Sequence, residues 1–84
     1  MLTISTNDLT WNPKTLTFSI EASVLDRRGW DAAMDYLTLR NPKTGGSALF
    51  KYVSRIHDGG EVAGWRYLCQ RPGLPDVSLV VFND

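Results

Sequence analysis

Four side chains in this sequence have the types and spacing of a small anion-binding surface: Tyr36, Lys51, Arg55 and Arg66. The strand pairing predicted from the sequence sets Lys51 directly opposite Arg66, with Tyr36 beside Lys51 and Arg55 nearby. Like charges opposite one another in a strand pair are destabilising, so this pair requires an acidic neighbour, solvent or an anionic partner. The functional interpretation is a binding site for phosphate, nucleic acid or an acidic protein surface. The simpler interpretation is a solvated outer face whose cations pair with carboxylates such as Glu21.

The histidine and the cysteine do not form a catalytic or metal motif. His57 precedes Asp58, which is half of many active sites, and Cys69 is the one thiol of the chain. One histidine and one cysteine fall short of the three or four ligands of a zinc site. The predicted hairpin also separates them too far for a cysteine–histidine nucleophile pair. We therefore interpret His57-Asp58 as turn residues and Cys69 as a small core residue, and we expect no enzyme activity, cofactor or metal.

Two further segments have part of a ligand-binding pattern. Residues 44–47 combine glycines with hydroxyl side chains, but the GxxxxGK[ST] spacing of a phosphate loop is absent and a strand follows, which favours a hairpin loop. Asp26, Asp31 and Asp35 lie close together in the sequence, but the ligand order and central glycine of an EF-hand loop are missing. We interpret these carboxylates as helix-start and surface groups.

The elements that position these residues are predicted mainly from two-residue alternation. In Thr15–Leu25 the apolar side chains alternate with polar ones, which is typical of a strand with one buried face. Further strands are predicted at residues 2–6, about 35–41, 47–56, 61–70 and 77–82. A short helical turn is predicted near 30–34, because Trp30, Ala33, Met34 and Leu37 have helical spacing. Residues 7–8 and 11–14 are predicted to be turns.

Asp58-Gly59 lies between two alternating runs and predicts a tight hairpin, because a type I′ turn needs positive φ at both central residues. The pairs that follow are Tyr52 with Trp65, Phe50 with Tyr67, and Ala48 with Cys69. A preceding hairpin closed by residues 42–45 would place Tyr36 beside Lys51 and Leu37 beside Phe50. The core is expected to include Leu16, Phe18, Ile20, Phe50, Trp65, Tyr67, Leu79 and Val81.

Together these elements predict an all-β or β-rich α+β domain spanning residues 1–84. We expect five to six antiparallel strands in a small sandwich or partly open barrel, with at most one short helical segment. Trp11 and Trp30 fall in or beside predicted loops. Each either plugs an end of the domain or is an exposed anchor for a partner, and plugging is the favoured interpretation.

Composition limits the classes of partner. The 84 residues include nine Lys and Arg and nine Asp and Glu, so zero net charge disfavours nucleic acid and anionic membrane. The lone cysteine favours a reducing cytoplasm. The N-terminal residues lack the pattern of a signal peptide, and no apolar run reaches the roughly 18 residues of a membrane span.

Scattered pieces of the chain are similar to small bacterial and prophage proteins with no assigned function: Phe18–Ser23, Asp58–Gly60 before Trp65–Tyr67, and Leu79–Asp84. The resemblance implies a bacterial or phage cytoplasmic protein and carries over no site residues. We expect a non-enzymatic interaction module, an accessory protein that docks on a larger protein. The alternatives are a single-stranded nucleic-acid-binding domain that uses the four candidate residues, and a structural subunit of a phage particle.

Overall fold

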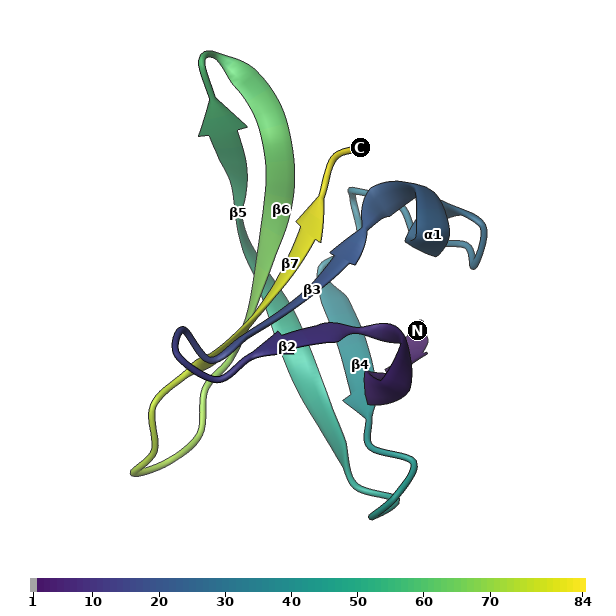
Figure 1. Ribbon diagram of the computed structural model, residues 1–84, viewed down its shortest axis with the longest axis vertical. Coiled ribbons are helices and arrows are strands. Elements are labelled where there is room, and N and C mark those ends of the chain that lie inside the picture. The colour runs from purple at the N-terminus through teal and green to yellow at the C-terminus, as the bar shows by residue number, and fades with distance from the viewer. Residues whose placement is uncertain (1) are drawn as a thin grey trace.

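The computed structural model describes residues 2–84 and consists mostly of strands (Figure 1). The elements are β1 (Thr3–Ser5), the 3-10 turn η1 (Thr6–Asp8), β2 (Thr10–Asn12), β3 (Thr17–Glu21), α1 (Ala22–Asp26), β4 (Tyr36–Arg40), β5 (Ser47–Asp58), β6 (Glu61–Cys69) and β7 (Val77–Phe82). The strands form one sheet in the order β1-β4-β5-β6-β7-β3-β2. This sheet curls into an open half-barrel, so the β-rich class, the partly open barrel and the single short α-helix are confirmed.

The strand count and the strand directions differ from the prediction. Residues 2–84 hold seven strands rather than five to six, because the predicted turn around Trp11 is the edge strand β2. The sheet is also not purely antiparallel, since β1 runs parallel to β4 and β3 runs parallel to β7. Alternation within one strand reports which face is buried and carries no information about the direction of its partner.

The strand predicted over Thr15–Leu25 is correct only in its middle part. Leu16 has φ of 51°, in the left-handed region, so it belongs to the turn that precedes β3. From Ala22 the chain continues as α1, where Ala22 and Leu25 are buried on one side of the helix. The apolar residues near the end of the predicted strand therefore reach the core from a helix.

The helical turn predicted near 30–34 is a turn without a helix. The amide of Ala33 donates to the Asp31 side chain (2.6 Å) and the amide of Met34 donates to the Asp31 carbonyl (3.0 Å). This turn leads directly into β4, whose position agrees with the prediction. The predicted pairs of Tyr36 with Lys51 and of Leu37 with Phe50 are confirmed.

The β5–β6 hairpin forms as predicted, but its turn lies one residue later. Gly59 and Gly60 occupy the turn with φ of 60° and 87°, as a type I′ geometry requires. Moving the turn by one residue shifts the pairs by two, and two β-bulges interrupt the ladder and make the shift three for the pairs between them. Tyr52 therefore pairs with Tyr67, and Lys51 pairs with Leu68. The predicted pairs Tyr52–Trp65, Phe50–Tyr67, Ala48–Cys69 and Lys51–Arg66 are wrong.

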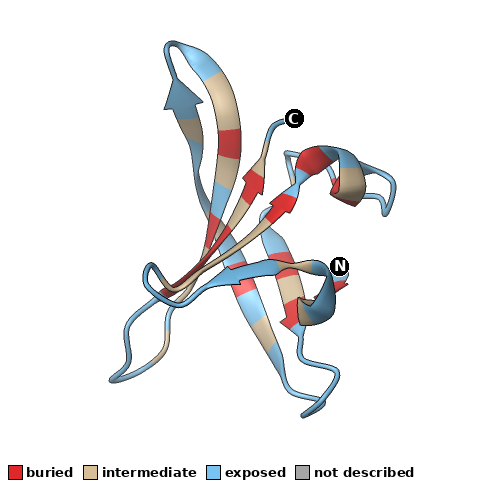
Figure 2. Cartoon of the chain, in the orientation of Figure 1, coloured by how far each residue is buried: buried red, intermediate tan, exposed pale blue. Residues whose placement is uncertain are grey.

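The core lies on the concave inner face of the half-barrel. Figure 2 shows buried residues along the strands and on α1, while the loops and the tip of the β5–β6 hairpin are exposed. The buried hydrophobic residues are Ile4, Ile20, Ala22, Leu25, Trp30, Leu37, Leu39, Phe50, Tyr67, Val77, Leu79 and Val81. Five predicted core residues are in this set, Phe18 and Trp65 pack against it partly buried, and Leu16 lies outside it because of its turn conformation.

The tryptophans have different roles. Trp30 is buried and its ring meets the ring of Trp65 edge-on, with centroids 5.1 Å apart, so it plugs the core. Trp11 keeps 42% of its surface exposed while its ring lies 4.5 Å from that of Phe18.

Within residues 2–84, no helix has the length and apolar character needed to span a membrane.

Candidate binding surfaces on the two faces of the sheet

The convex outer face carries a group of exposed apolar side chains. Tyr36, Leu49 and Val53 are 40%, 50% and 52% exposed. They line a shallow depression together with Lys51, Leu68 and Gln70. These six residues, from β4, β5 and β6, are called the outer patch below. Because β4 pairs with β5 at Tyr36–Lys51 and β6 pairs with β5 at Lys51–Leu68, Lys51 lies at the centre of the outer patch.

The structure separates the four predicted site residues. Tyr36 and Lys51 are cross-strand neighbours in the outer patch, as predicted. Arg66 pairs with Ser54 and Val80, so it lies on the same face but in a different row. Arg55 pairs with Trp65 and lines a hollow with Asp31, Ala32, Ala33, Val62 and Trp65. Because the bulge at Val53 changes which face the following residues occupy, Arg55 lies on the inner face.

The predicted charge repulsion between Lys51 and Arg66 does not arise, because Lys51 faces a leucine. Among residues 2–84 the one ion pair joins Arg28 and Asp8 at 2.8 Å. Neither Lys51 nor Arg66 is paired with a carboxylate, and Glu21 lies on β3, opposite Phe82. Both cations are therefore available to an anionic partner.

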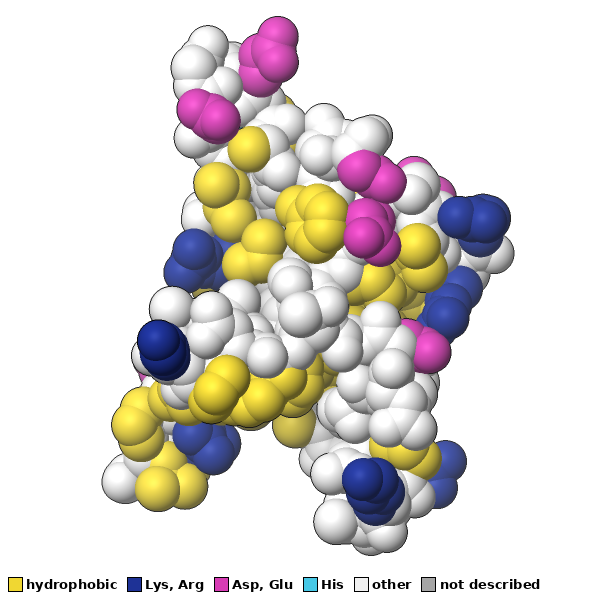
Figure 3. All heavy atoms as spheres, in the orientation of Figure 1, with side chains coloured by type: hydrophobic (Ala, Val, Ile, Leu, Met, Phe, Trp, Pro, Cys, Tyr) yellow, Lys and Arg dark blue, Asp and Glu magenta, His cyan; other side chains and the backbone are white. Residues whose placement is uncertain are grey.

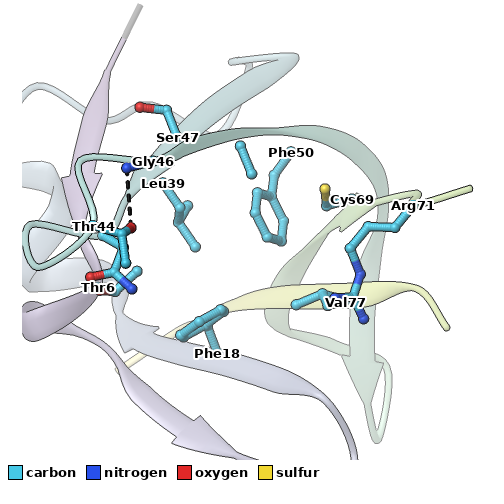
Figure 4. Close-up of a pocket in the computed structure, with 12 residues that line it drawn as sticks. Thr6, Phe18, Leu39, Thr44, Gly46, Ser47, Phe50, Cys69, Arg71 and Val77 are labelled. Carbon is cyan, nitrogen blue, oxygen red and sulfur yellow. Dashed lines mark hydrogen bonds between the residues drawn. The ribbon is translucent and has the colours of Figure 1, made fainter. Parts of the chain in front are cut away.

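A second candidate surface, not found from the sequence, is a pocket on the inner face (Figure 4). Its volume is about 310 Å³, and its lining includes residues of the loop 41–46 and Arg71 of the loop 70–76. Buried Leu39, Phe50 and Val77 contribute to its apolar lining. The remaining lining residues are Thr6, Phe18, Asn41, Thr44, Gly46, Ser47, Ala48, Cys69 and Arg71. Its walls come from strands far apart in sequence, which is why periodicity within one segment gives no sign of it.

Among the described residues that line this inner pocket, Arg71 is the one with a charge. Its Nε and Nη2 atoms both donate to the carbonyl of Pro75, at 3.2 and 2.8 Å. At the other end of the pocket the amide of Gly46 donates to the Thr44 hydroxyl at 3.2 Å, shown as the dashed line in Figure 4. The pocket thus combines an apolar interior with polar groups at two ends.

The buried hydroxyl of Tyr67 has a structural role. It donates to the carbonyl of Met34 (2.8 Å) and accepts from Nε1 of Trp30 (3.3 Å). Burial raises the pKa of Tyr67, so the phenol is neutral with both hydrogen bonds in use. Such a group is poorly suited to act as a general base.

Within residues 2–84 the predicted turn residues and carboxylates form no metal site. In the part of the chain that the structure describes, no group of three or more His, Cys, Asp or Glu residues is arranged to hold a metal ion. His57 and Asp58 end β5 beside the hairpin turn, and Cys69 is a partly buried free thiol packed against the core.

Comparison with known proteins finds no matching protein family, curated protein or solved structure.

Proposed function

We propose that this protein is a non-enzymatic interaction module, a small bacterial or phage-derived accessory protein that docks on a larger protein through its outer patch. The observation that carries the proposal is the exposure of Tyr36, Leu49 and Val53 together on the outer face. An antiparallel sheet face in contact with water is normally polar. Contiguous exposed apolar side chains, rimmed by polar groups, are typical of protein–protein contact sites.

The charges of the outer patch indicate the chemistry of the partner. Lys51 lies at its centre and Arg66 lies on the same face, and no carboxylate lines the depression. Tyrosine and arginine are enriched among residues that contribute most to interfaces. A partner segment with alternating apolar and acidic side chains would fill the apolar surface and neutralise both cations. The acidic groups would also accelerate association at low salt.

A selection of short random peptides displayed on phage tests this proposal. Immobilised wild-type protein is expected to enrich peptides that combine acidic with leucine, isoleucine or aromatic residues. Leu49→Asp and Lys51→Glu should each lose this enrichment, because one removes apolar contact and the other reverses the central charge. Leu74→Asp is the matched control, since Leu74 is 58% exposed in the loop that follows β6, outside the outer patch.

Two outcomes would favour the alternatives. Salt-dependent binding of oligothymidine that is lost in Lys51→Glu and Arg66→Glu would support a nucleic-acid-binding domain. A defined oligomer in light scattering that dissociates in Leu49→Asp would support a structural subunit whose patch contacts a second copy. Enrichment of the same peptides by wild type and by both patch variants would overturn the proposal.

A further inference from the structure

We propose that the inner pocket binds a small apolar molecule that carries one carboxylate. The pocket exists because the half-barrel does not close: β1 and β2 are the two edges of the sheet and do not pair with each other. Small closed β-barrels fill their interior with side chains or hold one small ligand. Here about 310 Å³ remains open at one end, near the lower limit of about 300 Å³ for small-molecule pockets.

The apolar part of the ligand follows from the lining. Leu39, Phe50 and Val77 are 3%, 2% and 8% exposed and hold fixed positions in the core. Phe18 forms a further part of the pocket wall. The ring of Phe18 also contacts the half-exposed ring of Trp11. Figure 3 shows hydrophobic side chains gathered below β2, facing the gap between the two loops. A hydrocarbon chain entering this gap would leave water for a preformed apolar wall.

The carboxylate of the ligand follows from Arg71. Two of its five N–H groups are held by the Pro75 carbonyl, which fixes the guanidinium and leaves three donors. No carboxylate lines the pocket, and Arg71 forms no ion pair within residues 2–84. A fixed, unpaired guanidinium suits a planar carboxylate, which accepts two parallel hydrogen bonds from it.

Titration of the protein with octanoate, octanol and octylamine tests this inference by calorimetry. Octanoate is expected to bind most tightly, and affinity should rise a few-fold per methylene from hexanoate to octanoate as apolar surface is buried. Arg71→Gln should lower octanoate affinity about tenfold and leave octanol unchanged, because it removes the charged hydrogen bond only. Arg55→Gln is the matched control, since Arg55 lines a different hollow.

Cys69 provides a local readout, because it is the one thiol of the chain and lines the pocket. Octanoate should slow alkylation of Cys69 by iodoacetamide in the wild type and in Arg55→Gln. Ala48→Leu, which places a larger side chain in the pocket wall, should weaken all three ligands together. Equal binding of octanoate and octylamine, or an unchanged octanoate affinity in folded Arg71→Gln, would overturn the inference. Because this pocket and the outer patch lie on opposite faces, neither test depends on the other.

Discussion

At the scale of single residues, the buried hydrogen bonds around Tyr67 hold one end of the core together. Tyr67 is fully buried, and its hydroxyl joins the indole of Trp30 to the carbonyl of Met34. In the described residues no buried side-chain nitrogen or oxygen lacks a hydrogen-bond partner. Burial of polar groups is tolerated only when they are paired in this way, so losing one hydroxyl leaves two groups unsatisfied.

Tyr67→Phe is therefore expected to lower the free energy of unfolding by about 1–3 kcal/mol, because Trp30 Nε1 and the Met34 carbonyl lose their partner. Urea denaturation followed by tryptophan fluorescence measures the change. Tyr52→Phe is the control, since the Tyr52 ring packs 5.5 Å from that of Tyr67 and its hydroxyl makes no hydrogen bond in the described structure. Equal stabilities of the two variants would contradict the role given to the hydroxyl.

The same experiment has a pH dependence with a defined sign. The folded protein raises the pKa of Tyr67, mainly through burial, so folding favours the neutral phenol. This contribution is fully present below the ordinary tyrosine pKa of about 10 and is lost as pH rises through the folded value. Wild type should therefore lose stability at alkaline pH more steeply than Tyr67→Phe.

At the scale of elements, the bulged β5–β6 hairpin and the β6–β7 pair depend on Gly64. A Cβ atom on Gly64 would lie 2.8 Å from the carbonyl oxygen of Val81 and 3.2 Å from the Cα of Phe82. Both contacts are with backbone of the neighbouring strand, which cannot move away without breaking the ladder.

The short helix α1 also depends on a distant segment of the chain. Asp84 caps its first turn, because the Asp84 carboxylate accepts a hydrogen bond from the Ser23 amide at 3.0 Å.

Gly64→Ala is expected to destabilise the protein by about 1–3 kcal/mol, the usual cost of overpacking a tight site. Gly45→Ala provides a comparison, because Gly45 has φ of 74° but no atom near its missing Cβ, so its cost is limited to about 1 kcal/mol of backbone strain. Thermal melts of both variants measure the difference. A smaller loss in Gly64→Ala than in Gly45→Ala would show that β7 shifts to make room.

At the scale of the whole molecule, one curled sheet supplies the core on its inner face and a water-exposed surface on its outer face. β7 is buried along most of its length, because β6 and β3 pair with its two edges and the core covers its inner side. The outer face, in contrast, leaves leucine and valine in water. Equal side chains on the two faces should therefore differ greatly in their contribution to folding.

Leu79→Ala is expected to lower the free energy of unfolding by about 2–5 kcal/mol, because Leu79 is fully buried on β7. Leu49→Ala should change it by about 0.5 kcal/mol or less, because half of Leu49 is already in water. Denaturant unfolding of both variants, with wild type as reference, measures the contrast. Comparable losses would mean that Leu49 is covered in the folded protein.

Local sequence patterns predict most of the strands and most of the turns, although they miss β2 and the helix α1. Alternation and turn residues depend on local contacts, so β7, the β4–β5 hairpin with its register, and the presence of the β5–β6 hairpin follow from nearby residues. Those local signals also place Tyr36 beside Lys51. The β5–β6 register did not follow, because Gly59-Gly60 competes with Asp58-Gly59 as the turn and no local signal marks the bulge at Val53.

The parallel pairs, the curl of the sheet and the separation of Arg55 from Lys51 depend on how the strands pack together. The β1–β4 and β3–β7 pairs join residues far apart in the chain, and no local pattern encodes such choices. The bulge at Val53 moves Arg55 to the inner face, away from Lys51. The inner pocket likewise requires walls from β3, β4, β5 and β7 at once. These features arise from packing between distant segments, whereas periodicity reports only the burial of each segment alone.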